Sequence, residues 1–162
     1  MSLDGYIAGP NGESDWIVMD PDIDFGALME AFDTVLLGRK TYEATREQGG
    51  GVGMPGTQAY VFSRTLRPAD CPGVTVSDQP EETLTALKAR AGKDVWLFGG
   101  GSLFYSLLEL DLVDAVEVAI IPVLLGGGLP LLPHPAQRTK LQLVKHRIYE
   151  KTGTVSLEYA VL

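Results

Sequence analysis

Cysteine is nearly absent from this chain of 162 residues, because Cys71 is the only one. A single cysteine excludes an internal disulfide framework and predicts a reducing compartment, the cytoplasm. No apolar run approaches the ~20 residues that a membrane-spanning helix needs. The first residues also lack the basic start and long apolar stretch of a signal peptide. With 45% hydrophobic and 21% charged residues, the composition predicts one globular domain over residues 1–162.

Basic residues are missing from the start of the chain, since no lysine or arginine occurs before Arg39. Eight acids in that segment account for the whole net charge of −8. They are Asp4, Glu13, Asp15, Asp20, Asp22, Asp24, Glu30 and Asp33. This balance argues against nucleic-acid binding, which needs a basic surface. A site for an anionic ligand is therefore expected after residue 38, and most of the acids are expected on a solvated face.

Alternating strand and helix patterns predict an α/β fold. The predicted strands span residues 2–8, 34–37, 59–62, 74–76, 95–98 and 115–121. The runs at 34–37, 59–62 and 95–98 are continuously apolar, which is typical of strands covered on both faces. Two alternating segments, 141–148 and 154–161, predict a hairpin. The expected architecture is three-layered, with a mostly parallel mixed sheet and a C-terminal antiparallel hairpin.

Helices are predicted between these strands. Apolar spacing predicts one over residues 25–32, and another is expected over 39–46. A capping box at Asp78–Glu81, with proline in the first turn, predicts a helix that ends near Gly92. A fourth helix follows the glycines that begin at Gly99. Glycines at 49–51 and 53 predict a loop, and Gly126–Gly128 a connection that rims the site.

Three strand ends carry the candidate chemistry. Each apolar run is followed by a polar or glycine-rich turn. These turns are Gly38-Arg39-Lys40-Thr41, Ser63-Arg64 and Gly99-Gly100-Gly101-Ser102. Ligands of open α/β sheets bind outside the carboxyl ends of the strands, where helix starts offer unpaired N–H groups to phosphate. Arginine adds forked contacts to phosphate oxygens. Together the three turns predict a site for a ligand with several phosphates, such as a dinucleotide, although each turn alone is also explained by simple packing.

Other familiar sites do not match these residues. Phe104 stands where a Rossmann fingerprint, or a nucleophile elbow at Ser102, needs glycine, and Arg39 stands where a P-loop needs lysine. The histidines at 134 and 146 lack metal-ligand spacing, and Cys71 lacks a catalytic partner. No metal or thiol catalysis is expected.

The order of these blocks resembles the dihydrofolate reductase superfamily. The matching residues are Ser2-Leu3-Asp4-Gly5-Tyr6-Ile7-Ala8, Trp16, Val35 to Glu43, Phe62-Ser63-Arg64, and Trp96 to Leu103. The branch that is most similar contains the reductase domain of the bifunctional riboflavin-biosynthesis protein. The resemblance covers almost the whole chain and implies a reductase in which NADPH donates a hydride. For that branch it implies 5-amino-6-(5-phosphoribosylamino)uracil reductase activity and a homodimer.

The resemblance also implies roles for individual residues. Ile7 and Ala8 would lie near the nicotinamide. Phosphates would be held by Gly38, Arg39, Lys40 and Thr41, the adenosine end and its 2′-phosphate by Ser63 and Arg64, and the pyrophosphate by Gly99, Gly100, Gly101, Ser102 and Leu103. Because two arginines can meet the extra phosphate, NADPH is preferred to NADH.

The substrate side is less determined. Dihydrofolate reductases carry tyrosine where this chain has Phe104, and an acid after a tryptophan near the first helix. Trp16 matches, while Asp20, Asp22 and Asp24 compete for the acid's place; Asp22 and Asp24 are the candidates to pass a proton or orient the substrate, and helix capping is their alternative role. The expected substrate is a small heterocyclic or ribosylated pyrimidine-like or pterin-like compound with a C=N or C=O bond. A nucleotide-binding sensor without turnover and a promiscuous detoxification reductase are the alternatives.

Overall fold

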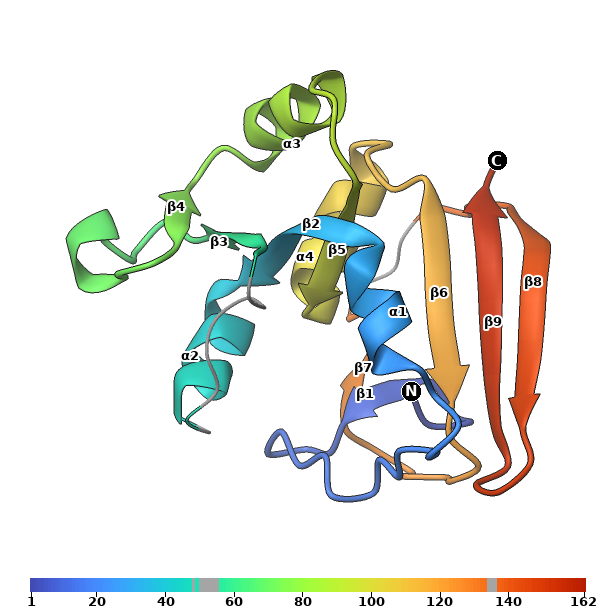
Figure 1. The fold of residues 1–162 in the computed structure, drawn as a ribbon. Coiled ribbons are helices and arrows are strands. Elements are labelled where there is room, and N and C mark those ends of the chain that lie inside the picture. The colour runs from blue at the N-terminus through green and yellow to red at the C-terminus, as the bar shows by residue number, and fades with distance from the viewer. Residues whose placement is uncertain (48, 50–55, 134–136) are drawn as a thin grey trace. The chain divides into compact units, whose positions relative to one another are not determined.

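The computed structural model describes residues 1–47, 49, 56–133 and 137–162 (Figure 1). It divides into two compact units. One unit is Phe25–Leu112, and the other combines Met1–Asp24 with Val113–Leu162. The expectation of one domain over the whole chain stays a prediction. Most of the loop predicted at 49–53, and the histidine at 134, lie outside the described residues.

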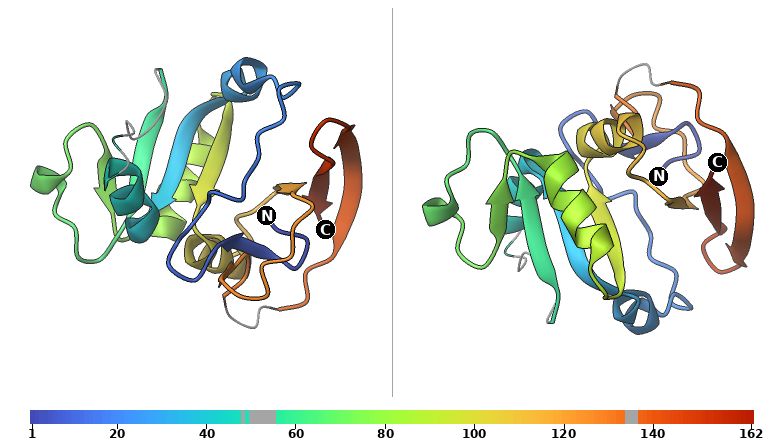
Figure 2. Two further views of the ribbon diagram at one scale, coloured as in Figure 1. Left: turned by 90° about the horizontal axis from the view of Figure 1, so that it is seen from below. Right: turned by 90° about the horizontal axis from the view of Figure 1, so that it is seen from above.

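The unit Phe25–Leu112 is built on a four-stranded parallel sheet. Its strands are β2 (Phe32–Gly38), β3 (Gln58–Phe62), β4 (Thr75–Ser77) and β5 (Asp94–Gly99), in the order β4-β3-β2-β5. Figure 2 shows β3, β2 and β5 running side by side. Its helices are α1 (Phe25–Glu30), α2 (Arg39–Glu47), α3 (Pro80–Ala89) and α4 (Gly101–Glu109), with a 3-10 turn at Pro68–Asp70. The predicted α/β class and its parallel strands are confirmed.

Strand β2 forms the centre of this unit. Val35, Leu36 and Leu37 are at most 2% exposed although they alternate between the two faces of the sheet. Val35 and Leu37 pack in one cluster with Val61 of β3 and Tyr42 of α2. A strand buried on both faces explains the continuous apolar run from which it was predicted.

Two local predictions in this unit are wrong. The capping box at Asp78–Glu81 does not form, because α3 starts directly after Gln79, whose side chain makes no capping hydrogen bond. Instead, the Ser77 hydroxyl accepts the Gln79 amide at 3.1 Å. The helix also ends at Ala89, before Gly92, and Arg90 leaves it to donate to the Thr34 hydroxyl at 2.6 Å.

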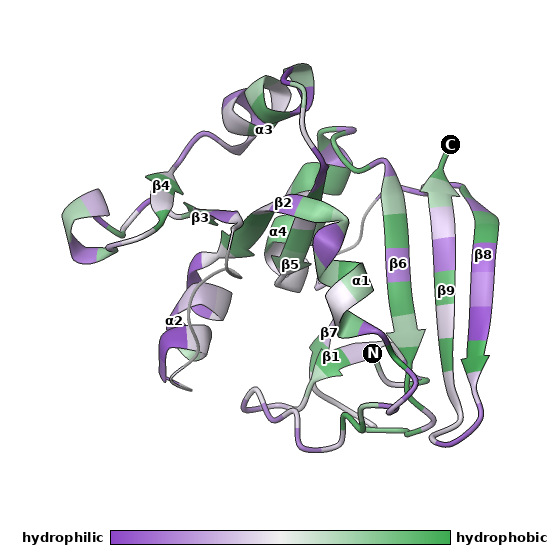
Figure 3. Cartoon of the chain, viewed as in Figure 1, coloured by the Kyte–Doolittle hydropathy of each residue, from purple (hydrophilic) through white to green (hydrophobic). Residues whose placement is uncertain are grey.

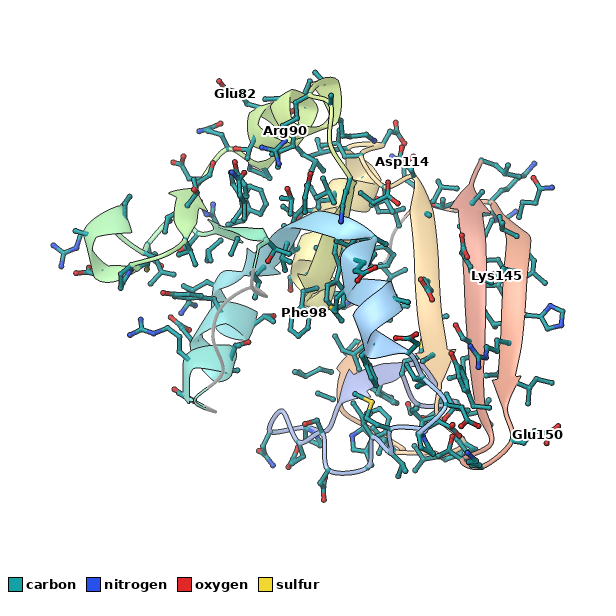
Figure 4. All side chains as sticks on the ribbon, viewed as in Figure 1. Glu82, Arg90, Phe98, Asp114, Lys145 and Glu150 are labelled. Atoms are coloured by element: carbon teal, nitrogen blue, oxygen red, sulfur yellow. The ribbon has the colours of Figure 1, made fainter. Side chains whose placement is uncertain are left out.

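The run at 95–98 is less buried than predicted. Phe98, labelled in Figure 4, is 49% exposed. It packs edge-to-face on Trp96, with 5.1 Å between ring centroids. The reason is the strand order, since β5 is the last strand of its sheet and pairs only with β2 within it.

The unit of Met1–Asp24 and Val113–Leu162 is antiparallel. Its strands are β1 (Tyr6–Ala8), β6 (Ala115–Ile120), β7 (Leu129–Pro130), β8 (Leu141–Tyr149) and β9 (Thr154–Val161). β6, β9 and β8 form one sheet in that order, and β1 pairs with β7. The C-terminal hairpin is confirmed. Figure 3 shows hydrophobic ends and a hydrophilic middle along β8.

The first strand is shorter than predicted. Residues 2–5 form a turn in which the Gly5 amide donates to the Ser2 carbonyl at 3.1 Å, with Gly5 at a φ of 90°. Ser2 makes only an isolated bridge to Ile121, so the strand begins at Tyr6. Among the residues that the model describes, no helix has the length and apolar character to cross a membrane.

Candidate functional site

Three strand ends meet at one edge of the parallel sheet. In the register of β2 with its neighbours, Gly38 lies opposite Phe62, and Leu37 lies opposite Gly99. Because β2, β3 and β5 run in the same direction, the turns that follow them emerge at the same edge. The sheet therefore brings together the glycine, arginine and serine turns that the sequence singled out, all within the unit Phe25–Leu112.

The turns after β2 and β5 are in direct contact. A Cβ added to Gly100 would lie 3.2 Å from the Thr41 hydroxyl oxygen, and one added to Gly38 would lie 3.7 Å from the Leu103 Cβ. Gly99 has a φ of 147°, which favours glycine. The close approach of the two turns therefore favours glycine at positions 99 and 100, whereas a Cβ at Gly38 would make only ordinary van der Waals contact.

Helix α4 starts at the second of these turns. Gly100 precedes its first residue, and no side chain caps this end. The Leu103 and Phe104 amides donate to the Gly100 carbonyl at 3.0 and 3.1 Å. Among the described residues, the Gly101 and Ser102 amides have no acceptor at this helix start, so they are available to an anion, which fits the phosphate role expected of these two residues.

Arg39 opens helix α2 and is already paired. Its Nη1 lies 3.0 Å from both carboxylate oxygens of Glu43, one helical turn later. Both side chains are about two-fifths exposed, at 42% and 41%, so the pair is solvent-screened and weak. Lys40 is exposed beside it. The sequence interpretation did not weigh Glu43, although the spacing of four residues is a recognised signal for such a pair.

Ser63 shapes the turn that presents Arg64. The Ser63 hydroxyl accepts the amides of Thr65 and Leu66 at 3.1 and 3.0 Å, while its own amide donates to the Ser77 carbonyl at 3.0 Å. Arg64 is exposed, and it makes no hydrogen bond or ion pair with the residues that the model describes. Ser63 is thus a turn-forming residue, and Arg64 is the guanidinium that is ready for an outside anion.

The other predicted residues lie in the unit that contains the N-terminus. Ile7 and Ala8 are half-buried on β1. Trp16 is half-buried as well, and its indole N–H donates to the Glu13 carbonyl at 3.1 Å. These residues belong to one compact unit with the three competing aspartates Asp20, Asp22 and Asp24.

The aspartates differ sharply in their surroundings. Lys151 Nζ donates to Asp22 Oδ1 at 2.6 Å, and the Arg147 guanidinium donates to the Asp22 carbonyl at 3.2 Å. Asp24 is exposed directly before α1. Asp22 and Asp24 both keep their candidate roles, but the Asp22 carboxylate is engaged by a cation.

Asp20 is the buried member of the three, at 1% exposure. It accepts the Asp22 amide at 2.9 Å and, from Thr152, the amide at 3.1 Å and the hydroxyl at 2.9 Å. Burial raises the pKa of Asp20, but these hydrogen bonds and the nearby Lys151 outweigh it and hold that pKa below its ordinary value. Asp20 is therefore an anion that anchors the segment before α1 to the hairpin turn.

The part of the chain that the structure describes offers no metal site. Across the described ranges, no group of three or more histidine, cysteine, aspartate or glutamate side chains could hold a metal ion.

Both the sequence and the fold are similar to those of known proteins. The family model described as the RibD C-terminal domain matches residues 1–154. The chain belongs to the RibD C-terminal domain family. The resemblance to the riboflavin-reductase branch of the dihydrofolate reductase superfamily is thereby confirmed.

Among relatives of this RibD C-terminal domain, the YyaP protein of Bacillus subtilis (strain 168) is 37% identical, covering 98% of this chain and 90% of YyaP. A Shewanella sp. PV-4 structure assigned to riboflavin biosynthesis matches with a TM-score of 0.83 and 26% identity, covering 100% of this chain and 95% of its own. Enterococcus faecalis dihydrofolate reductase, complexed with NADP(H) and RAB-propyl, matches with a TM-score of 0.71 and 18% identity, and the match covers 99% of this chain and 92% of the reductase chain. The dihydrofolate reductase-like fold is confirmed.

Proposed function

We propose that this chain is an NADPH-dependent reductase that transfers a hydride to a C=N or C=O bond of a small heterocyclic or ribosylated pyrimidine-like or pterin-like compound. The observation that carries the proposal is the meeting of three turns at one sheet edge, with Arg39, Arg64 and the contact between Gly38 and the Gly99–Gly101 turn. Membership of a reductase family supports it, as does the NADP(H) complex of the Enterococcus relative.

The residues at this edge fit a phosphorylated cofactor. A Cβ added to Gly100 would approach the Thr41 hydroxyl oxygen to 3.2 Å, and the start of α4 lacks a side-chain cap. We assign phosphate contacts to Gly38, Arg39, Lys40 and Thr41, and pyrophosphate contacts to Gly99, Gly100, Gly101, Ser102 and Leu103. Arg64, held out by the Ser63 turn, is assigned to the 2′-phosphate, because a guanidinium binds phosphate through two parallel hydrogen bonds.

When bound, NADPH would supply the hydride that the substrate carbon accepts, and a proton would be added to the nitrogen or oxygen of the reduced bond. The contribution of this chain is binding and orientation, which supply much of the rate in such reactions. We assign Ile7 and Ala8 to the nicotinamide and Trp16 to a flat substrate. Asp22 or Asp24 orients the substrate or passes the proton through water. A cytoplasmic location belongs to the same proposal and is supported by the single cysteine, Cys71.

The test separates binding from turnover. NADPH fluorescence is titrated with protein, and NADPH oxidation is then followed with dihydrofolate, with ribosylated aminopyrimidinones, and with a panel of carbonyl and imine compounds. Binding with oxidation of one class supports the reductase. Binding without oxidation across the whole panel favours the sensor, and absence of NADPH binding rejects both.

We also propose that two copies of the chain associate through β8. This strand ends its sheet, and its aliphatic side chains are exposed by 44–63%: Leu141, Leu143, Val144 and Ile148. The register puts three of them on one face with apolar residues of β9: Leu141, Leu143 and Ile148, opposite Val161, Tyr159 and Val155. His146 is the only ionisable β8 residue on that face, whereas the cations Lys145 and Arg147 lie on the other face. Two copies can therefore pack through the first face without bringing like charges together.

Light scattering after gel filtration tests this surface. The wild type is expected at twice the monomer mass, and Ile148→Asp at the monomer mass. Gln142→Asp places the same charge on the opposite face of β8 and is expected to remain dimeric. A monomeric wild type rejects the proposal.

A further inference from the structure

The carboxylate of Asp4 holds a glycine-rich loop that is distant in sequence. Asp4 Oδ1 accepts the Leu125 amide at 3.2 Å, and Oδ2 accepts the Gly126 amide at 2.8 Å. The Ser2 hydroxyl and the Gly126 amide lower the pKa of Asp4, so the group is ionised at neutral pH. Both bonds are therefore charge-assisted, which makes them stronger than bonds between neutral groups.

The turn that carries Asp4 is itself fixed. Ser2 is fully buried, donates its amide to the Tyr6 carbonyl at 2.8 Å, and accepts the Tyr6 amide on its hydroxyl at 2.9 Å. The Leu3 amide donates to the Val123 carbonyl at 2.9 Å. The turn thus joins the start of β1 to the segment that leads into the glycine loop.

The C-terminal end of the loop, Gly128, lies against the backbone of Ala8. A Cβ added to Gly128 would lie 2.2 Å from the Ala8 carbonyl oxygen and 3.3 Å from the Gly9 Cα, and Gly128 has a φ of 149°. At Gly127, by contrast, an added Cβ would meet no atom within 4 Å. Two adjacent glycines therefore differ in whether the fold tolerates a side chain.

We propose that Asp4 and Gly128 are positioning residues that fasten the loop Leu125–Gly128 onto the carbonyl of Ala8. This inference rests on the proposed function, in which Ile7 and Ala8 face the nicotinamide. Asp4 grips one end of the loop, and Gly128 lets the other end approach the strand within contact distance. Because a misplacement of about 1 Å can slow a hydride or group transfer by about a hundredfold, such a fastening sets turnover without touching the phosphates.

Hydrogen exchange tests the fastening itself, whatever the protein binds. In Asp4→Asn, exchange of the Leu125 and Gly126 amides is expected to be about tenfold faster than in the wild type, since charge-assisted bonds are lost. Asp15→Asn removes one exposed acid of the same unit and serves as the matched control. Equal exchange in Asp4→Asn and in the wild type overturns the inference, even if NADPH binds.

Kinetics then test the positioning role. Gly128→Ala is expected to lower the kcat of NADPH oxidation by about tenfold to a hundredfold. The affinity for adenosine 2′,5′-bisphosphate, which probes only the residues assigned to the phosphates, is expected to stay within about twofold of the wild-type value. Gly127→Ala is expected to change neither. A parallel loss of kcat and of nucleotide affinity overturns the positioning role. Where Gly128→Ala does not fold, Asp4→Asn is measured in the same two assays with the same criteria.

The two proposals fail in different ways. A wild type that does not bind NADPH removes the proposed function, and the exchange experiment still decides whether the loop is fastened. A wild type that oxidises NADPH, together with unchanged exchange in Asp4→Asn, removes only the fastening.

Discussion

Replacing Glu43 by glutamine changes the charge beside the proposed cofactor phosphates without touching any assigned contact. In the protein, Arg39 Nη1 lies 3.0 Å from both Glu43 oxygens, so this nitrogen must leave the pair before it can donate to a phosphate, while the other N–H groups of the guanidinium stay available. An exposed pair at this spacing contributes about 0.3–0.5 kcal/mol, which is roughly a factor of two in affinity. Removing the acid also removes its repulsion of the phosphate, so Glu43→Gln is expected to bind NADPH about two- to fivefold more tightly.

Arg64 gives the complementary result. It has no partner to leave among the described residues, so its full charge is available to the 2′-phosphate. Charge-assisted hydrogen bonds of this kind justify an expected loss of about tenfold or more in NADPH affinity for Arg64→Ala. Arg39→Ala is expected to lose less, because the wild-type arginine is partly neutralised by Glu43.

The assay is fluorescence titration with NADPH and, separately, with NADH. Arg67→Ala is the matched control, since Arg67 lies three residues after Arg64 and pairs with Asp70 at 3.0 Å. NADH affinity is expected to stay within about twofold in Arg64→Ala, because NADH lacks the 2′-phosphate. Equal losses for both cofactors would refute the 2′-phosphate assignment, and weaker NADPH binding in Glu43→Gln would refute the reasoning about charge.

Three further outcomes are expected. Leu37→Ala removes a side chain that is 2% exposed in the central cluster. The free energy of unfolding should therefore fall by about 3 kcal/mol, and the melting temperature measured by calorimetry by roughly 10 °C. A decrease in melting temperature of less than about 2 °C would contradict the burial argument. Because the pKa of Asp20 is lowered in the folded state, the ionised Asp20 stabilises the fold above its ordinary pKa, and this stabilisation is lost as the pH falls through the folded value. Chemical denaturation from pH 7 to pH 2 should therefore show that the difference in free energy of unfolding between the wild type and Asp20→Asn decreases below about pH 4. A difference that stays constant over this range would argue against the linkage. Asp22→Asn should slow NADPH oxidation, since Lys151 holds the Asp22 carboxylate in place at 2.6 Å; oxidation at the wild-type rate in Asp22→Asn, together with a loss in Asp24→Asn, would assign the proton-handling role to Asp24.

Local patterns predicted the strand ends well. The runs that became β2 and β3 are continuously apolar because both faces of these strands are covered, and each run is followed by the turn residue that the fold uses. The alternating segments of the C-terminal hairpin were equally readable. The pair of Arg39 with Glu43 was also visible in principle, because it depends only on helical spacing.

Residues whose surroundings come from distant segments were not predictable. Nothing in the spacing of Asp20, Asp22 and Asp24 tells which carboxylate is buried, since Asp20 is satisfied by Thr152, 132 positions later in the chain. The same holds for Phe98, whose exposure follows from the position of β5 in its sheet.

The amino-acid sequence by itself determined the α/β alternation, the edge at which three turns meet and the arginines that follow them, because these features depend on periodicity and on neighbours within a few residues. Only the tertiary structure decided which aspartate is an anchor, that Asp4 grips the loop before β7, and that Gly128, unlike Gly127, has no room for a side chain. These last features arise where segments more than a hundred residues apart come into contact, and no local pattern records such a meeting.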